Sequence, residues 1–230
     1  MVIKSILRAS FGRKSDNQVN WGDFRRTSPF SRRFGYDRLG GPVDRYYIEQ
    51  FLALNRNHIR GRALEVKDNT YTARFGSDNI SESEILDIDP NNKMATVIAD
   101  IQNAPNIKSN SFDCIVFSQV LQFIYDYDAA MKTINRILKP GGTLLMTVPG
   151  ITQIAYKQLG TTWFWSFSEA SISRILTKYF DQSRVSISVY GNVQSAAAFL
   201  YGLGADELTP AELDVADPDY QVIIASMAQK

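Results

Sequence analysis

The stretch GRALEVKDNTYTARFG (residues 61–76) constrains this chain most, because it opens with a short apolar strand and continues without glycines where they are expected. Leu64, Glu65 and Val66 are predicted to form a buried strand. In a nucleotide-binding α/β protein, closely spaced glycines follow such a strand and let the backbone approach the ligand. Here residues 67–71 are Lys, Asp, Asn, Thr and Tyr. The question is whether a loop with these side chains still receives a cofactor.

Predicted helices and strands alternate along the rest of the chain. One segment, FDCIVFSQ, is almost continuously apolar, which is typical of a strand buried on both faces of a sheet. Helices are predicted after Pro42, at 127–138 (ended by a Lys-Pro-Gly-Gly turn), after a capping box from Ser166 to Glu169, and near 193–203. Strands are predicted at 63–66, 84–89, 95–100, 112–119, 143–149, 185–190 and 221–227.

This alternation predicts an α/β fold: a Rossmann-like, doubly wound, mainly parallel seven-stranded sheet with helices on both faces. Ligands of such sheets bind beyond the carboxyl ends of the strands, near the point where the strand order reverses. The loop 67–71 and the acidic residues that end two of the strands are expected at that edge. We predict one domain over residues 42–230, preceded by an extension of residues 1–41.

The composition is that of a globular protein without disulfides. Of 230 residues, 44% are hydrophobic and 21% are charged, and Cys114 is the only cysteine. No apolar run approaches the roughly 20 residues that a membrane span needs. The N-terminus is too polar for a secretory signal. We therefore expect a cytoplasmic protein.

Positive charge is concentrated in the N-terminal extension. Residues 1–45 carry ten Lys or Arg against four Asp or Glu, whereas the net charge of the chain is +1, so the remainder is acidic. A basic arm can contact phosphate, nucleic acid or an anionic membrane surface, or it can be a solvated leader. The acidic body and the lack of a known binding module argue against nucleic acid. An anionic small substrate or an acidic partner fits better.

Two acidic residues, Asp89 and Asp100, end neighbouring predicted strands. Asp89 lies 22 positions after Lys67, close to the offset of about 20 residues at which a carboxylate meets ribose hydroxyls. A carboxylate can accept both protons of a vicinal diol, and Asp100 could accept from an adenine amino group. Either residue alone could instead cap the following helix or turn. Together they favour a nucleoside-binding edge.

Five segments after Pro42 carry a family resemblance: RALEV (62–66), ILDIDP (85–90), VIADI (97–101), SFDCIVFSQVLQFI (111–124) and RILKPGGTLLMTVPG (136–150). With these segments, the chain from about Pro42 onward resembles the class I S-adenosylmethionine-dependent methyltransferases, particularly those with a type-11 methyltransferase domain. The segments GPVDRYYIEQFL and NTYTARFG are further similar to a bacterial subgroup associated with glycosyltransferases and polysaccharide pathways. The resemblance implies a class I methyltransferase-like domain over 42–230 and S-adenosylmethionine as the cofactor.

The resemblance also implies roles for individual residues at the cofactor. Both tyrosines of the first helix would close over the cofactor, although packing of an amphipathic helix explains them equally well. In order along the chain, Arg45 would meet the cofactor carboxylate, Tyr46 and Tyr47 would cover it, Glu65 would lie near its methionyl end, Asp89 at the ribose, Asp100 and Ile101 at the adenine, and Ser118 and Gln119 near the sulfonium.

The chain departs from the family at the glycine-rich turn, where Lys67, Asn69 and Tyr71 occupy the three glycine positions. Their side chains would crowd the methionyl group or require a different loop conformation. Lys67 also places a positive charge near a sulfonium and an ammonium. At about 4–8 Å and an effective dielectric of about 20, one such contact costs about 2–4 kcal/mol. Lys67 could instead pair with Glu65, Asp68 or the cofactor carboxylate, so this degenerate loop puts cofactor binding in doubt.

No catalytic residue stands out. His58 precedes the first strand as a surface or packing residue, Cys114 falls inside a buried strand, and no Cys/His cluster indicates a metal. Methyl transfer can proceed without a strong base, because the sulfonium is electrophilic and alignment can dominate. Gln122 could orient an acceptor, and Trp163 and Trp165 could stack on a sugar or aromatic ring or pack under a loop.

Two functions from different classes follow from these observations. The first, which the sequence favours, is S-adenosylmethionine-dependent methyl transfer to a small-molecule or saccharide acceptor, in polysaccharide or natural-product biosynthesis. The second is a methyltransferase-fold protein that has lost methyl transfer and serves as a pseudoenzyme, as the partner of a biosynthetic enzyme, or in another reaction.

Overall fold

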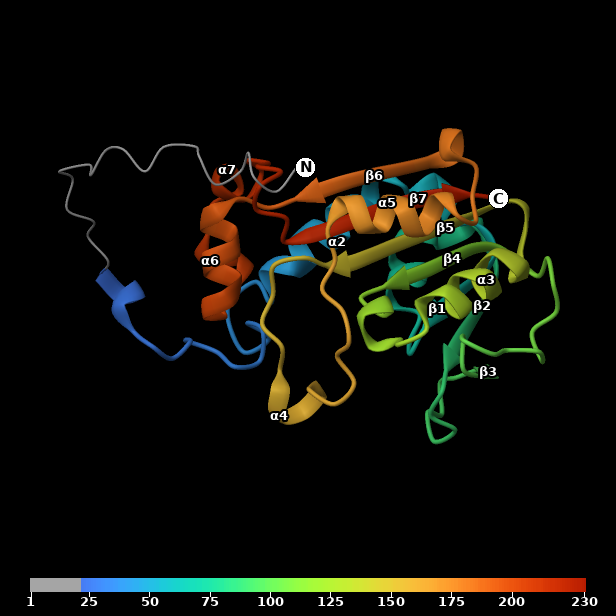
Figure 1. Ribbon diagram of the computed structural model, residues 1–230, viewed down its shortest axis with the longest axis horizontal. Coiled ribbons are helices and arrows are strands. Elements are labelled where there is room, and N and C mark those ends of the chain that lie inside the picture. The colour runs from blue at the N-terminus through green and yellow to red at the C-terminus, as the bar shows by residue number, and fades with distance from the viewer. Residues whose placement is uncertain (1–21) are drawn as a thin grey trace, which may run out of the picture.

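A single seven-stranded sheet with the order β3-β2-β1-β4-β5-β7-β6 forms the centre of the protein (Figure 1). This computed structural model describes residues 22–230, so the expectations for residues 1–21 lie outside it. β7 is antiparallel to β5 and β6, whereas β3, β2, β1, β4 and β5 pair in parallel. The strands are β1 (Gly61–Val66), β2 (Ile80–Asp87), β3 (Val97–Ile98), β4 (Phe112–Ser118), β5 (Leu138–Pro149), β6 (Val185–Tyr190) and β7 (Ile223–Gln229).

Helices cover both faces of the sheet, which confirms the predicted doubly wound architecture (Figure 1). Buried side chains of α3 and α5 pack on one face, and those of α2, α6 and α7 pack on the other. Among residues 22–230, no helix is long and apolar enough to cross a membrane. The helices are α2 (Val43–Leu54), α3 (Tyr127–Ile137), α4 (Tyr156–Leu159), α5 (Glu169–Thr177), α6 (Val193–Tyr201) and α7 (Pro210–Leu213).

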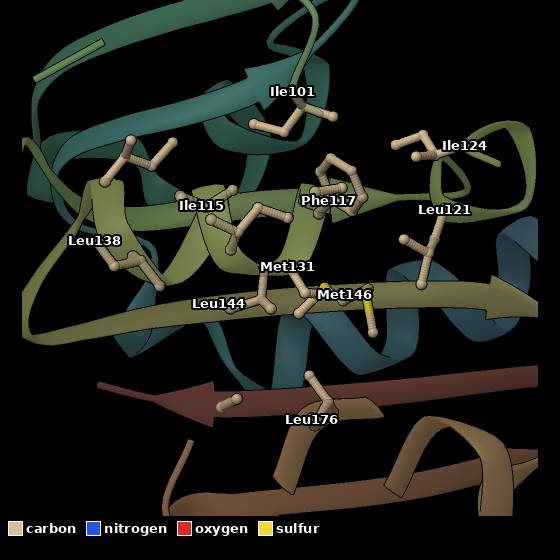
Figure 2. Close-up of a cluster of buried hydrophobic side chains, with 14 of the residues drawn as sticks. Ile101, Ile115, Phe117, Leu121, Ile124, Met131, Leu138, Leu144, Met146 and Leu176 are labelled. Atoms are coloured by element: carbon tan, nitrogen blue, oxygen red, sulfur yellow. The ribbon is translucent and has the colours of Figure 1, made fainter. Parts of the chain in front are cut away.

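Alternate side chains of the central strands enter two separate cores. In β4, Ile115 and Phe117 join the core under α3 and α5, while Cys114 and Val116 join the core under α2 and α6. Figure 2 shows the first core, in which Met131 of α3 lies among the β4 and β5 side chains. Burial raises the pKa of the Cys114 thiol to about 12, so this thiol is a packing group. The nearly continuous apolar run of β4 is explained by burial on both faces.

Two strands end earlier than the sequence predicts. β2 ends at Asp87 because its pairing with β3 stops at Asp87 and Ile98. The prediction that Asp89 ends this strand is therefore wrong, and so is the prediction that the next strand reaches Asp100. In both cases an apolar residue, Ile88 or Ala99, lies between the last paired residue and the acidic one. This apolar residue makes the strand pattern in the sequence longer than the hydrogen-bonded strand.

The start of α5 also differs from the prediction. Its cap is Ser168, whose side chain accepts from the backbone N–H of Ser171, and the Ser171 hydroxyl completes the capping box. The predicted box from Ser166 to Glu169 was therefore out of register by two residues. Serine in place of glutamate at the third helical position concealed the correct register.

Residues 29–41, which we call the strap, run beside α6 and return the chain to α2 (Figure 1). Phe30 N–H donates to the carbonyl of Tyr201 at 2.8 Å, and Ala205 N–H donates to the carbonyl of Gly41 at 2.8 Å. Gly35 has a φ of 94°, and a Cβ there would lie 2.5 Å from the Leu203 carbonyl oxygen. The strap is thus closely packed against the segment that follows α6.

Candidate functional site

The strand order reverses between β1 and β4, and the loops after these two strands begin at the same edge of the sheet. In Figure 1 the arrowheads of β4 and β5 point toward this edge, and the long segment that carries α4 leaves β5 there. In a doubly wound sheet this is the place where a ligand binds. The candidate site is therefore built from the ends of β1, β2 and β4 and the segments near them.

Glu65, near the end of β1, organises the loop that follows. It is buried, and its two carboxylate oxygens accept from the backbone N–H groups of Tyr71 at 3.2 Å and Thr72 at 2.7 Å. Burial raises the pKa of Glu65 above its ordinary value, although these N–H bonds oppose the shift. Glu65 thus holds the first residues of the single π-helical turn η3 (Thr72–Gly76).

Lys67 has a backbone conformation that favours glycine. Its φ is 76°, in the left-handed region that costs a side-chain-bearing residue about 1–2 kcal/mol. Its N–H donates to the carbonyl of Leu86 at 2.8 Å, and its carbonyl accepts from Nδ2 of Asn92 at 2.8 Å. Its side chain is exposed. The loop after β1 thus adopts, at a lysine, a backbone conformation that glycine reaches at no steric cost.

The side chains at the other two glycine positions each have their own contacts. Asn69 Nδ2 donates to Oγ of Ser83 in β2 at 3.1 Å. The Tyr71 hydroxyl accepts from Nη1 of Arg45 at 3.1 Å, and its ring lies 6.2 Å from that of Phe75. These two side chains are thus held by β2, η3 and α2.

Asp87, and not the predicted ribose ligand Asp89, is the acidic residue that ends β2. The Asp87 carboxylate accepts from the Asp89 N–H at 3.0 Å and from Nδ2 of Asn92 at 2.7 Å. Partial burial works against ionisation of Asp87, but these bonds and the charge of Lys67 hold its pKa below the ordinary value. Asp89 lies beyond the strand, where its carboxylate accepts from the backbone and side chain of Asn91 at 2.9 Å. In the sequence Asp87-Ile88-Asp89, Asp87 is the first acidic residue after the apolar run of the strand, and this position could have indicated it.

Asp100 and Ile101 follow β3. The Asp100 carboxylate accepts from the backbone N–H of Gln102 at 2.9 Å and from its Nε2 at 3.1 and 3.2 Å. Ile101 is buried in the core that contains α3. Asp100 therefore shapes a local turn at this edge of the sheet, as the capping interpretation of this residue expects.

The end of β4 carries a group of polar side chains. The hydroxyls of Ser118 and Thr147 lie 2.8 Å apart, and Gln119, with a φ of 55°, donates its N–H to the Thr147 carbonyl at 2.8 Å. Gln122 is 2% exposed, and its Nε2 donates to the Gln119 carbonyl at 3.0 Å. Its Oε1 is buried without a hydrogen-bond partner, which leaves one acceptor unsatisfied beside the end of the strand.

The three residues chosen from α2 separate into two groups. Arg45 contacts the loop after β1 through Tyr71, as described above. The Tyr46 hydroxyl donates to Asp214 at 2.7 Å, and this bond raises the pKa of Tyr46 to about 12. The Tyr47 hydroxyl donates to the carbonyl of Leu213 at 2.9 Å. Both tyrosines are thus directed to the end of α7, as the packing interpretation predicts.

The two tryptophans also differ. Trp165 donates from Nε1 to the carbonyl of Ile124 at 2.9 Å, and its ring packs against those of Tyr125 and Tyr127. Trp163 lies nearly parallel to Phe34 of the strap, with ring centroids 6.3 Å apart and an interplanar angle of 11°. Phe34 has a φ of 59°, so the strap presents this ring from a strained turn. Sequence patterns could not connect two residues so far apart in the chain.

The part of the chain that the structure describes contains no group of three or more His, Cys, Asp or Glu side chains arranged to hold a metal ion. His58 belongs to the short 3₁₀-helix Arg56–His58 before β1, away from the carboxyl ends of the strands. The polar groups gathered at the end of β4 are hydroxyls and carboxamides. This arrangement can bind and orient a ligand but offers no strong base.

Residues 61–146, from β1 into β5, match the family model described as a methyltransferase domain. Over 129 residues the chain is 29% identical to the ubiquinone/menaquinone biosynthesis C-methyltransferase UbiE of Teredinibacter turnerae, a match that covers 48% of this chain and 51% of that protein. A 37-residue segment is 51% identical to UbiE of Haemophilus ducreyi, covering 16% of this chain and 14% of that protein. The chain thus spans about half, or less, of the length of these curated relatives.

The fold is similar to that of several solved proteins. A S-adenosylmethionine-dependent methyltransferase from Archaeoglobus fulgidus matches with a TM-score of 0.54 and 13% identity, covering 81% of this chain and 94% of that one. The 1,6-didemethyltoxoflavin-N1-methyltransferase of Burkholderia thailandensis, with S-adenosylhomocysteine bound, matches with a TM-score of 0.51 and 13% identity, covering 80% and 77%. The [4+2]-cyclase SpnF matches with a TM-score of 0.52 and 16% identity, covering 79% and 81%. These likenesses show the fold, and the methyltransferase-domain match covers residues 61–146. The fold alone does not determine the reaction.

Proposed function

We propose that this protein transfers a methyl group from S-adenosylmethionine to a small-molecule or saccharide acceptor. The conformation of Lys67 carries the proposal: the turn after β1 has a left-handed residue, as a glycine-containing cofactor loop does, although its sequence has lost the glycine. The methyltransferase-domain match includes this turn, the end of β2 and the end of β4.

The residues at the sheet edge fit the adenosyl half of the cofactor. Asp87 is an ionised, partly exposed carboxylate at the end of β2, and we infer that it, rather than Asp89, would accept from the ribose hydroxyls. Asp100 and Ile101 would lie at the adenine. A glycine at position 69 would leave space for the cofactor beside the loop. The Asn69 side chain is hydrogen-bonded to Ser83 and does not have to fill that space.

The methionyl half would meet groups that differ from those of a glycine loop. Glu65 is already bonded to the loop backbone, so it would order the loop and not contact the cofactor directly. The Arg45 guanidinium has two phenol oxygens as acceptors and could also receive a carboxylate. The positive charge of Lys67 interacts favourably with the Asp87 carboxylate and lowers its pKa. This attraction partly offsets the repulsion between Lys67 and the sulfonium of the cofactor.

Bound S-adenosylmethionine would supply an electrophilic methyl group on its sulfonium. Ser118 and Gln119, at the end of β4, would lie beside the sulfonium. The unsatisfied Oε1 of Gln122 could accept from a hydroxyl or N–H group of the acceptor. Trp163 and Phe34 would cover the acceptor and exclude water. The chain's contribution to the rate would then be alignment and desolvation, without a strong base.

The acceptor class follows from the groups that would surround it. Aromatic rings from the strap and from the segment after β5 offer a stacking surface for a sugar or an aromatic ring. Exposed Arg32 and Arg33 of the strap favour an anionic acceptor. An acceptor of this kind would place the protein in polysaccharide or natural-product biosynthesis, together with a partner enzyme of that pathway.

Calorimetric titration of the purified protein with S-adenosylhomocysteine and S-adenosylmethionine tests the proposal. Asp87→Ala and Asp100→Ala should each weaken binding by about tenfold or more, because each removes a charged hydrogen-bond acceptor. Asp78→Ala, at an exposed acid outside the site, should bind as the wild type does. Asp89→Ala separates the two ribose assignments. No binding by the wild-type protein at millimolar concentration, or unchanged affinity in both folded variants, would contradict the adenosyl site.

Methyl transfer itself needs a separate measurement. Protein incubated with methyl-labelled cofactor and an extract of small molecules and saccharides should yield a labelled product. Binding of S-adenosylhomocysteine without any label transfer would indicate a protein that has kept the cofactor site and lost the reaction.

A further inference from the structure

An open surface cavity lies at the opposite edge of the sheet from the candidate site, beside the amino ends of β1 and β2. Its volume is about 420 Å³, and it is formed where the end of α2 and the turn Arg56–His58 meet residues 74–79. A cavity of this size is within the range of small-molecule sites, about 300–1,000 Å³. β1 separates it from the carboxyl edge, so the methyl-transfer proposal does not use it.

The polar side chains that line the cavity are mostly hydrogen-bond donors. The lining residues include two arginines, two asparagines and one serine, and none of them is acidic. The neighbouring Asp78 lies on the same turn but does not line the cavity. The residues that matter for binding are Arg56, Asn57, Arg74, Ser77 and Asn79, with Phe75 as an aromatic wall.

Both guanidinium groups are available to a ligand. Arg56 is exposed and has no carboxylate partner within residues 22–230. Arg74 pairs with Glu49 at 2.7 Å, but the two side chains are 55% and 33% exposed. Such surface pairs contribute about 0–1 kcal/mol, so a stronger anion can compete for Arg74. The planar fork of a guanidinium matches the oxygens of a phosphate.

The backbone around the cavity is irregular and closely packed. The turn η3 is π-helical, and Ser77 after it has a φ of 45° and a ψ of −129°. A Cβ on Gly76 would lie 2.6 Å from the Ile80 side chain and 3.0 Å from that of Ile59, so this floor has no room to collapse. Strained residues and π-helical turns are concentrated at functional sites. Arg74, Ser77 and Asn79, on either side of this turn, all line the cavity.

We propose that this cavity binds a small phosphate-bearing molecule. The two arginines would hold the phosphate oxygens, the carboxamides of Asn57 and Asn79 and the Ser77 hydroxyl would donate to the same group, and Phe75 would contact the rest of the molecule. The cavity shares the turn η3 with the loop after β1. None of the residues that line it is assigned to the cofactor or the acceptor, so binding at this cavity can be tested apart from methyl transfer.

Titration of the full-length protein with inorganic pyrophosphate tests this site. Arg56→Ala and Arg74→Ala should each weaken pyrophosphate binding by about tenfold or more. Arg174→Ala is the matched control, because it removes an exposed arginine of α5 that belongs to neither site. Arg56 is exposed, so Arg56→Ala should keep the wild-type melting temperature and carries the test by itself. Amide resonances of residues 74–79 should move when pyrophosphate is added.

Three outcomes would overturn the proposal. The first is no pyrophosphate binding by the wild-type protein at millimolar concentration. The second is wild-type affinity in the folded Arg56→Ala variant. The third is loss of binding in Arg174→Ala to the same extent as in Arg56→Ala, which would mean that anion binding follows net charge and not this cavity.

Discussion

The guanidinium of Arg45 donates from Nη1 to the hydroxyl of Tyr71, 3.1 Å away. The same guanidinium donates from Nε and Nη2 to the hydroxyl of Tyr36 at 3.0 and 2.8 Å. One side chain thus joins α2, the loop after β1 and the strap. Burial opposes the charge of Arg45, but Asp44 and the two tyrosines raise its pKa above the ordinary value, so Arg45 stays charged throughout the pH range in which the protein is studied.

Arg45→Lys should therefore destabilise the protein while keeping the charge. An ammonium cannot direct fixed bonds to both hydroxyls, and we expect the free energy of unfolding in urea to fall by about 1–3 kcal/mol. Arg33→Lys, at an exposed position of the strap, is the control and should change little. Tyr36→Phe should lose about 1 kcal/mol because it removes one of the acceptors. Wild-type stability of Arg45→Lys would mean that this junction does not hold the three segments together.

Lys67 allows the effects of backbone and charge to be separated. Lys67→Gly relieves the left-handed strain and should raise the free energy of unfolding by about 1 kcal/mol, whereas Lys67→Ala keeps the Cβ and should give no such gain. Both variants remove the positive charge. Both should therefore narrow the preference for S-adenosylhomocysteine over S-adenosylmethionine in calorimetric titrations. If the preference is the same in all three proteins, the Lys67 ammonium does not act on the sulfonium.

Asp44 provides a pH-dependent prediction. Burial raises the pKa of Asp44, against the opposing charge of Arg45 and backbone hydrogen bonds, and its Oδ1 makes no hydrogen bond. With a raised pKa, the folded protein binds more protons at this site than the unfolded chain does. The stability that Asp44 contributes is thus fully present below its ordinary pKa of 3.8 and is lost as pH rises through the raised folded pKa.

Asp44→Asn removes this titration while keeping the shape of the side chain. Urea unfolding from pH 4 to pH 8 should show the wild-type protein losing stability relative to the variant as pH rises. A difference in stability that is independent of pH, or one that changes in the opposite direction, would show that Asp44 is not the source of the effect.

Trp163 and Trp165 should respond differently to truncation. Trp165→Ala removes a hydrogen bond to Ile124 and packing against Tyr125 and Tyr127, so it should destabilise the protein by about 2–4 kcal/mol. Trp163→Ala should cost about 1 kcal/mol and lower turnover of the acceptor more than affinity for S-adenosylhomocysteine. Urea unfolding and calorimetry measure the two effects. Equal loss of cofactor affinity and turnover in Trp163→Ala would remove it from the acceptor side.

The sequence predicts the sheet well because β4 and β5 are buried on both faces. Their nearly continuous apolar runs are typical of strands at the centre of a sheet. It is less reliable at strand ends. The exposed Ile88 extends the apolar pattern past Asp87, but hydrogen bonding with β3 has already ended there. Sequence periodicity reflects only which side chains are apolar. The end of a strand depends also on how far the neighbouring strand extends to pair with it.

The candidate site was only partly predictable for a different reason. The pattern places Glu65 and Gln119 next to strand ends, and the family resemblance adds the roles expected of them at the cofactor. Phe34 and Tyr36 reach the site only because the strap packs on the segment after α6, about 165 residues later in the chain. The conformation of Lys67 was also hidden, since lysine rarely adopts a positive φ. Such features depend on tertiary contacts, which no local pattern encodes.

The packing of the strap has a consequence for how the protein is made on the ribosome. The strap is synthesised before any strand of the sheet, yet its backbone partners Tyr201 and Ala205 are synthesised only after β1 to β6. Strands β1 to β5 can form in the order of synthesis, because they are complete by Pro149. A nascent chain halted before α6 would therefore expose Phe30 and Phe34 without their partners, and that intermediate is the one most dependent on chaperones.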